Sequence, residues 1–347
     1  MKRIISFDIL KFFCILFVII THFVSYYIPN ISRKLLFPFY ISMAVPFFLI
    51  ITGYTHCKSL NKIKSQSIIN YYDKSTFKPK LQRAFSPYLM ALFIEIILIY
   101  LYSTSKNTIK IVPFLKTILK SILIYGAWGP GGYYPIIYIQ ILIWIPILYT
   151  LFKRNPLSTF ISVILINICF EIFAHNMLTE PIYRLLSFRY IIFILLGMVL
   201  YLYEDCLSNT YIPHISLLVG IIYLIYVNYI DYSPTFFTWW TGTAMPTAFY
   251  SFGVVFFFKK LNPYFQNFHH LLRPITFIGE ASYQIFFVQM IFFGPLQNFS
   301  PNLAIINEHI RIRYTFLFSL IFCVSIGCIW YKLESSIFKN QTFVSVK

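Results

Sequence analysis

Three ionisable side chains, Asp8, Lys11 and His22, lie in one almost wholly apolar stretch that includes KFFCILFVIITH at residues 11–22. Placing such a group in hydrocarbon costs roughly 2.5–3.5 kcal/mol on insertion scales, so a functional reason is expected for each. At about 100° per residue, all three fall on one face of a helix, over a rise of about 21 Å. Asp8 and Lys11 can neutralise each other at one end, while His22 lies towards the other.

His22 is the side chain in this stretch that suits acid–base chemistry. A histidine, whose ordinary pKa is near neutrality, can remove a proton from a hydroxyl at physiological pH. The alternative is a histidine at a helix end that hydrogen-bonds to lipid headgroups. Taken alone, the position of His22 fits both interpretations.

The composition is that of a membrane protein. Of the 347 residues, 59% are hydrophobic and 11% are charged, whereas soluble globular chains carry about 25% charged residues. Apolar runs of about 18 residues or more recur along the chain, as in proteins with several membrane-spanning helices. These features exclude a soluble or secreted protein. We predict an all-α, polytopic integral membrane protein with a single domain over residues 1–347.

About ten transmembrane helices are expected, and an even number places both termini on one side. The largest group of basic residues, from Lys58 to Arg83, lies between the second and third spans, on the side of the termini. Cytoplasmic loops carry such an excess, so both termini are expected in the cytoplasm. No small-residue cleavage site follows the first span, which is therefore expected to be retained. The expected spans are 4–24, 36–56, 84–101, 133–152, 157–174, 189–203, 212–229, 240–258, 274–293 and 314–331.

The formal net charge of +17 does not indicate a nucleic-acid partner. The basic residues lie mostly in short loops, where they orient the protein and meet anionic lipid headgroups, and they form no continuous face that could follow a phosphate backbone. The six cysteines form no C-x-x-C pair and the histidines show no ligand spacing. Neither a disulfide framework nor a metal site is therefore expected.

Residues 106–125, KNTIKIVPFLKTILKSILIY, carry four lysines on one side of a helix. Lys106, Lys110, Lys116 and Lys120 fall within an arc of roughly 120°, opposite an apolar side. One explanation is a helix in the membrane interface with its lysines at the headgroups. A second is that the lysines gather an anionic substrate, and a third is an eleventh span.

The first segment resembles that of the acyltransferase-3 family, membrane O-acyltransferases that act on sugars and surface polysaccharides. A basic residue, ten intervening residues and a histidine are typical of the first span of this family, and Lys11 and His22 match them. Asp8, in FDILK, also fits. The family usually has arginine at the position of Lys11, and lysine keeps the charge but loses the bidentate geometry.

Further matches to this family follow in order along the chain. MAVPFFLIITGY at 43–54 resembles its second span, in which Gly53 permits close helix packing. FKPKLQRAFSPY at 77–88 resembles a basic-x-x-Arg motif, carried by Lys80 and Arg83. The other matches are GPGGYYPIIYIQILIWIPIL at 129–148, RYIIFILLGMVLY at 189–201 and IGEASYQIFFVQ at 278–289. In the last, Phe286 and Gln289 stand where the family commonly has a tyrosine and a histidine, so no late catalytic histidine is expected.

The resemblance implies an acyl-CoA donor, with acetyl the expected group, and no permanently bound cofactor. The donor would enter from the cytoplasm, where Lys80, Arg83 and Lys11 can meet the CoA phosphates. His22 would act as general base on the acceptor hydroxyl, with Asp8 and Lys11 completing the catalytic face; a covalent acyl-histidine route stays open. Lys80 and Arg83 could instead be ordinary topological anchors.

The resemblance also implies an acceptor, a sugar hydroxyl of a surface or lipid-linked glycan, at a bacterial plasma membrane. The residues expected near the acceptor are Trp128, Tyr133, Tyr134, Gln140, Arg189 and Glu280. Aromatic residues at span ends are also the normal interfacial belt, and Glu280 could instead pair with Arg273 or orient a base. Two more carboxylates in apolar runs, Glu95 and Glu171, are expected to line a cavity rather than to pack as neutral acids.

Two other functions are alternatives. A transporter or flippase for glycans would also need buried polar groups, but not the spacing of Lys11 and His22 or the pair of Lys80 and Arg83. Inverted repeats would favour it, and the sequence shows no clear internal symmetry. The third possibility is a structural or assembly protein without chemistry.

Overall fold

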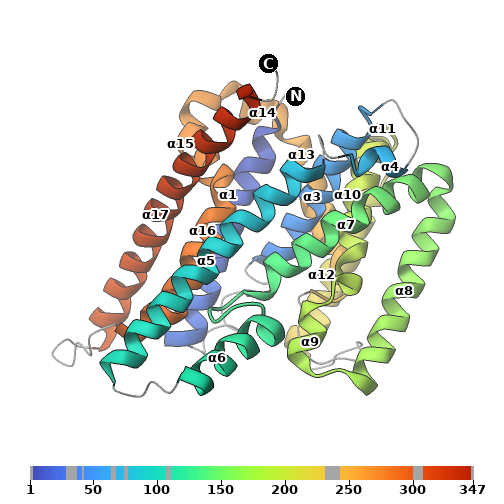
Figure 1. Ribbon diagram of the computed structural model, residues 1–347. Coiled ribbons are helices and arrows are strands. Elements are labelled where there is room, and N and C mark those ends of the chain that lie inside the picture. The colour runs from blue at the N-terminus through green and yellow to red at the C-terminus, as the bar shows by residue number, and fades with distance from the viewer. Residues whose placement is uncertain are drawn as a thin grey trace.

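The computed structural model describes residues 3–28, 37–40, 43–63, 68–73, 77–106, 111–230, 243–299 and 308–344. Every regular element in these ranges is a helix, so the predicted all-α class is confirmed. The long helices run side by side between two ends of a bundle (Figure 1). α1 (Ile5–Tyr27) begins, and α17 (Glu308–Val344) finishes, at the same end, which we call the terminal end.

Within the described residues, seven helices are long and apolar enough to cross a membrane. They are α1, Pro38–Leu60 (which includes α3, Ala44–Leu60), α5 (Phe77–Ser105), α7 (Tyr133–Arg154), α8 (Pro156–Met177), α12 (Ile212–Tyr229) and Ile312–Ile337 within α17. Two helices joined at a bend of 54°, α15 (His269–Glu280) and α16 (Ser282–Phe293), make an eighth if they form one span. α10 (Ile191–Leu202) and α13 (Thr247–Lys260) are shorter. A helix therefore lies at each expected span, but ten membrane crossings stay a prediction.

Short elements connect these helices. They are α2 (Phe37–Tyr40), α4 (Ile68–Tyr71), α6 (Ile111–Lys120), the π-helix η2 (Ser121–Tyr125), α9 (Glu180–Leu185), the 3-10 helix η3 (Ser187–Tyr190), α11 (Glu204–Ser208), α14 (Asn262–Asn267) and the 3-10 helix η5 (Pro295–Phe299). α6 has ten residues and η2 five, together fewer than the roughly 20 that span a membrane. η2 contacts α9, and α6 lies at the end of the bundle away from the terminal end (Figure 1). Residues 106–125 are not among the helices that the described part of the chain shows to be long and apolar enough to cross a membrane; Lys110 lies outside the described residues.

Close helix contacts fix the position of α1 and its neighbours. A Cβ atom at Gly53 of α3 would lie 2.1 Å from the carbonyl oxygen of Ile194 on α10, so the close packing expected at Gly53 is confirmed. A Cβ atom at Gly279 of α15 would lie 1.9 Å from the carbonyl oxygen of Asp8. Only glycine permits so close an approach, which brings the bend between α15 and α16 against the start of α1.

Candidate functional site

Asp8 is the centre of an ion-pair network at the terminal end of α1. Its carboxylate lies 2.6 Å from Nε of Arg3 and 2.6 Å from Nζ of Lys11. Arg3 also pairs with Glu280, at the end of α15. The expected neutralisation of Asp8 by Lys11 is confirmed, whereas the partner of Glu280 is Arg3 and not Arg273. Only 8% of the Asp8 side chain is exposed, so its two cations offset a large desolvation cost.

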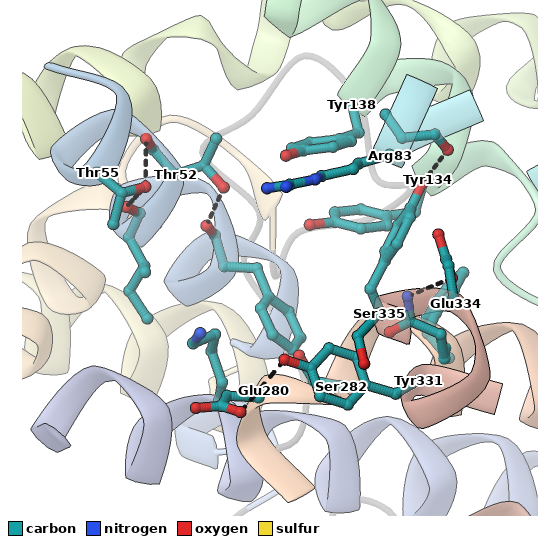
Figure 2. A pocket seen from close by; sticks show the side chains of 17 residues that line it. Thr52, Thr55, Arg83, Tyr134, Tyr138, Glu280, Ser282, Tyr331, Glu334 and Ser335 are labelled. Carbon is teal, nitrogen blue, oxygen red and sulfur yellow. Dashed lines mark hydrogen bonds between the residues drawn. The ribbon is translucent and has the colours of Figure 1, made fainter. Parts of the chain in front are cut away.

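A cavity of about 500 Å³ opens beside this network, and we call it the Lys11 cavity. Side chains from α1, α3, α5, α7, α15, α16 and α17 line it, so it lies where these helices meet. Its charged lining residues are Lys11, Arg83, Glu280 and Glu334. Arg83, Tyr134 and Tyr138 project into the same part of the cavity (Figure 2).

Both acidic residues of the Lys11 cavity have donors of their own. Glu280 pairs with Arg3 and accepts a hydrogen bond from the Tyr331 hydroxyl at 3.2 Å. Glu334 accepts one from Nε2 of Gln284 at 2.8 Å. A lysine ammonium has three donors, and the pair with Asp8 engages one carboxylate oxygen. The lining can therefore offer positive charge to an anionic ligand through Lys11 and Arg83.

The two basic residues of the 77–88 segment have different surroundings. Arg83 is exposed and lines the Lys11 cavity. Lys80, one turn earlier on α5, is partly buried and donates to Oγ of Ser59 on α3 at 3.3 Å. Lys80 is not among the residues that line the cavity. The structure therefore brings Arg83, and not Lys80, to the site that the sequence assigned to both.

A second cavity, of about 280 Å³, lies away from the terminal end, and we call it the Arg184 cavity. Its walls are Tyr26 of α1, the loop of residues 127–132, parts of η2 and α7, and Pro181 with Arg184 of α9. Pro181 and Arg184 are one helical turn apart, so they share a face of α9. The Arg184 guanidinium lies 4.9 Å from the centre of the Tyr133 ring, within cation–π range.

The loop 126–132, GAWGPGG, is held in place from behind by Glu95 of α5. Only 1% of Glu95 is exposed, and its two carboxylate oxygens accept hydrogen bonds from the backbone N–H groups of Trp128 and Gly129, both at 3.0 Å. Nε2 of Gln289, on α16, donates to the loop at the carbonyl of residue 130, at 3.4 Å. Glu95 therefore lies behind the loop that lines the Arg184 cavity and holds its shape, and it lines neither of the two cavities as had been expected.

His22 lies on α1 next to the Arg184 cavity. It precedes the lining residue Tyr26 by about one turn, and Phe293 of α16 packs against both: the ring centroids are 6.5 Å from His22 and 6.1 Å from Tyr26. Arg184 is near enough to interact electrostatically with His22. Lys11 and His22 are separated by a rise of about 16 Å along α1, so one helix contributes Lys11 to one cavity and places His22 beside the other.

The remaining residues that the sequence placed in the catalytic or acceptor site are distributed over both cavities. Asp8 is about 21 Å from His22 along α1, so it can act on Lys11 but not on the histidine. Trp128 and Tyr133 line the Arg184 cavity, while Tyr134 and Glu280 line the Lys11 cavity. The expected catalytic face is therefore divided between the two ends of α1.

Gln140 and Arg189 line neither cavity. The side-chain amide of Gln140 donates to the carbonyl of Leu185 at 2.8 Å and accepts from the N–H of Ser187 at 3.0 Å, which ties α7 to the segment after α9. Arg189 is fully buried, with its guanidinium 4.2 Å from the centre of the Tyr183 ring. Through these contacts, Gln140 and Arg189 fix the position of α9, the helix that carries Arg184.

Arg184 and Arg3 are the site residues that sequence reasoning missed. The segment TEPIYRLL, residues 179–186, contains a signal for Arg184. Proline favours the first turn of a helix, and an arginine one turn later shares its face, which is how Pro181 and Arg184 come to line one cavity. Arg3 precedes the apolar stretch, where a basic residue has the pattern of an ordinary topological charge, yet it lies within reach of Asp8.

A comparison with family models matches residues 4–331 to an acyltransferase domain of the acyltransferase-3 type. No curated protein and no solved structure gives a significant match to the chain.

Proposed function

Because the chain belongs to the acyltransferase-3 family, we propose that it transfers an acyl group, expected to be acetyl, from acyl-CoA to a sugar hydroxyl of a surface or lipid-linked glycan. The family match makes the protein a multi-pass membrane acyltransferase. The donor, the acceptor and a bacterial plasma membrane are parts of the proposal. The observation that carries it is the placement of Lys11 and His22 on one helix, with Lys11 in the lining of one cavity and His22 next to a second.

The Lys11 cavity suits the donor. The excess of basic residues predicts that the terminal end faces the cytoplasm, where acyl-CoA is available. Lys11 and Arg83 can bind phosphate oxygens through charge-assisted hydrogen bonds. The volume of about 500 Å³ falls within the usual range for small-molecule sites, roughly 300–1,000 Å³. The pantetheine arm would then extend from this cavity along α1 towards His22.

The Arg184 cavity suits the acceptor, since His22 adjoins it. His22 takes the proton from the acceptor hydroxyl as its oxygen attacks the thioester carbonyl. A C–O bond forms, the C–S bond breaks, and the proton passes from His22 to the departing thiolate of CoA. Fixed donors around the reacting carbonyl would lower the barrier by stabilising its developing negative charge. In this scheme Asp8 holds Lys11 in position for the donor and takes no part at His22.

The test is mass spectrometry of surface glycans from cells that carry the wild-type protein, its His22→Ala variant or neither. We expect a fixed mass increment of one acyl unit with the wild type alone. The absence of any increment, together with altered transport of unmodified glycan, would contradict acyl transfer and support the transporter.

A further inference from the structure

α6 and η2 together present three different stripes of side chains next to the Arg184 cavity. Lys116 and Lys120 of α6 are exposed and form a cationic stripe. Ser121 and Tyr125 of η2 line the cavity. Three leucines form an apolar stripe, and each exposes between 53% and 72% of its surface: Leu115, Leu119 and Leu123. One short helical segment thus combines an apolar, a cationic and a cavity-lining surface.

The cationic stripe lies between the other two. At about 100° per residue from Leu115, Leu119 lies at about 40° around the helix. On the same scale Lys116 lies at about 100°, Lys120 at about 140° and Ser121 at about 240°. The hydrogen bonds of a π-helix join i and i+5, so η2 turns less per residue than α6, which brings its cavity-lining side chains nearer to the lysines. The order around the helix is therefore leucine, lysine and cavity.

Ile118 fixes which side of α6 faces the bundle. It lies at about 300°, roughly opposite the lysines, and only 8% of it is exposed. The lysines form no ion pair with any residue that the structure describes. A helix with leucines on one side and lysines beside them is typical of one that lies in the membrane interface. α6 lies at the end of the bundle away from the terminal end (Figure 1).

From this order we infer that α6 binds the phosphate and the adjoining hydrocarbon of a lipid-linked acceptor. Lys116 and Lys120 bind the phosphate, and the leucine stripe packs on the hydrocarbon. The inference rests on the proposed function and deepens it, because it selects a lipid-linked glycan over a free polysaccharide. Hydrocarbon, phosphate and first sugar follow one another in such a glycan in the same order as the three stripes. Lysine ammonium groups bind phosphate oxygens through charge-assisted hydrogen bonds.

With the phosphate at the lysines, the first sugar occupies the Arg184 cavity. Lys120 directly precedes Ser121, which lines that cavity. The volume of about 280 Å³ is close to the lower end of the usual range for small-molecule sites, roughly 300–1,000 Å³, so it suits one sugar unit. The rings of Tyr125 and Trp128, exposed by 48% and 40%, can pack on the C–H groups of that sugar. Since His22 adjoins the cavity, the sugar next to the phosphate is the one that receives the acyl group.

The experiment uses the purified full-length protein in nanodiscs of neutral phosphatidylcholine. A farnesyl phosphate probe with a diazirine in its first isoprene unit is photolysed, and the labelled residues are mapped by mass spectrometry. We expect label on the leucine stripe of α6. Competitors that each lack one part of the ligand are then compared with the best of farnesyl-phospho-glucose, -galactose and -N-acetylglucosamine.

The competitors are farnesyl glucoside without phosphate, glucose 1-phosphate without hydrocarbon, and phosphatidylglycerol without sugar. We expect each of them to displace the probe at least tenfold less well than the complete ligand, because a hydrogen bond to a charged group changes affinity by about 10–100-fold. Equal displacement by phosphatidylglycerol would make α6 an ordinary headgroup anchor and overturn the inference. Label confined to other helices would overturn it as well.

Lys116→Gln combined with Lys120→Gln should lower the affinity for the complete ligand at least tenfold and leave that for farnesyl glucoside unchanged. Lys120→Arg should retain binding, because it keeps the charge. Arg313→Gln is the control, since Arg313 is exposed on α17, which begins at the end of the bundle that holds α6 (Figure 1). It should change neither affinity, and an effect as large as that of Lys120→Gln would overturn the inference.

Acetyl transfer from acetyl-CoA is measured separately in the same nanodiscs, so binding and chemistry can fail independently. Selective binding of the complete ligand without any transfer to it would contradict the proposed function alone. Transfer to glucose 1-phosphate or farnesyl glucoside that is as efficient as transfer to the complete ligand would support the proposed function and overturn the inference.

Discussion

Tyr133 and Tyr134 are consecutive residues at the start of α7, yet they line different cavities. Successive side chains on a helix point about 100° apart. The Tyr133 ring therefore lies beneath Arg184, while the Tyr134 ring lies 5.4 Å from that of Phe286. The start of α7 therefore lies between the two cavities. In the proposed reaction, the acyl group of a donor bound on one side would reach the acceptor hydroxyl on the other side next to this point.

His22→Ala should abolish transfer while the protein still inserts and folds. Loss of a general base typically lowers the rate by about 10²–10⁴-fold, and no ion pair joins the His22 side chain to another of the described residues. Turnover of acetyl-CoA by purified variants measures the effect. His270→Ala, at an exposed position of α15, is the control and should be fully active. Turnover close to normal in His22→Ala would remove His22 from the mechanism.

Lys11→Met should raise the KM for the donor strongly, and Lys11→Arg should retain function or improve it. Methionine removes one of the two cationic side chains that line the Lys11 cavity, and it leaves Asp8 with Arg3 as its partner. Arginine keeps the pair and adds bidentate phosphate binding. Initial-rate kinetics with acetyl-CoA give the comparison.

Exchanging the pair, Asp8→Lys with Lys11→Asp, separates donor binding from stability. The exchange keeps the net charge but places a lysine beside Arg3 and a carboxylate in the Lys11 cavity. We expect almost no activity from it. An active exchange variant would show that the pair contributes only to folding.

Arg83→Ala should weaken acyl-CoA binding by about tenfold or more, whereas Lys80→Ala should have little effect. Arg83 lines the Lys11 cavity, while Lys80 is engaged with Ser59, and a charge-assisted contact to phosphate contributes about 1.5–3 kcal/mol. Titration calorimetry with acetyl-CoA tests both variants. Equal losses would mean that the two residues act together as the sequence motif suggests.

Glu95→Gln should weaken binding of the acceptor and leave binding of the donor unchanged. An amide NH₂ in place of one carboxylate oxygen faces a backbone N–H of the loop, so one buried hydrogen bond is lost, at about 1–3 kcal/mol. We expect a lower Tm and a raised KM for the acceptor, with the KM for acetyl-CoA unchanged. Glu95→Asp, which keeps both oxygens, should be intermediate. An unchanged acceptor KM in Glu95→Gln would show that the loop of residues 126–132 does not contribute to acceptor binding.

The apolar runs could be predicted from the sequence because a helix that crosses lipid bonds its backbone polar groups internally and needs a continuous run of apolar side chains. Residues 212–229 are an example: the expected span and α12 coincide. The pairing of Asp8 with Lys11 could also be predicted, because a separation of three residues places both on one face.

The distribution of the site between two cavities could not be predicted in this way. Arg184 and Arg189 are both basic residues of one short segment, and only the packing of α9 against the start of α7 decides which faces a cavity. Glu95 and the loop at Trp128 are 33 residues apart, and no local pattern joins them. Tertiary contacts between distant helices determine these positions.

The central claim is that an acyl group moves from a donor at the terminal end to an acceptor at the other end of the bundle. Proteoliposomes sorted by orientation test it, with radiolabelled acetyl-CoA on one side of the membrane and the acceptor glycan on the other. We predict labelled glycan only when acetyl-CoA is on the side of the terminal end, and none with His22→Ala. Unlabelled glycan that crosses the membrane, or label transfer that persists in His22→Ala, would contradict the account.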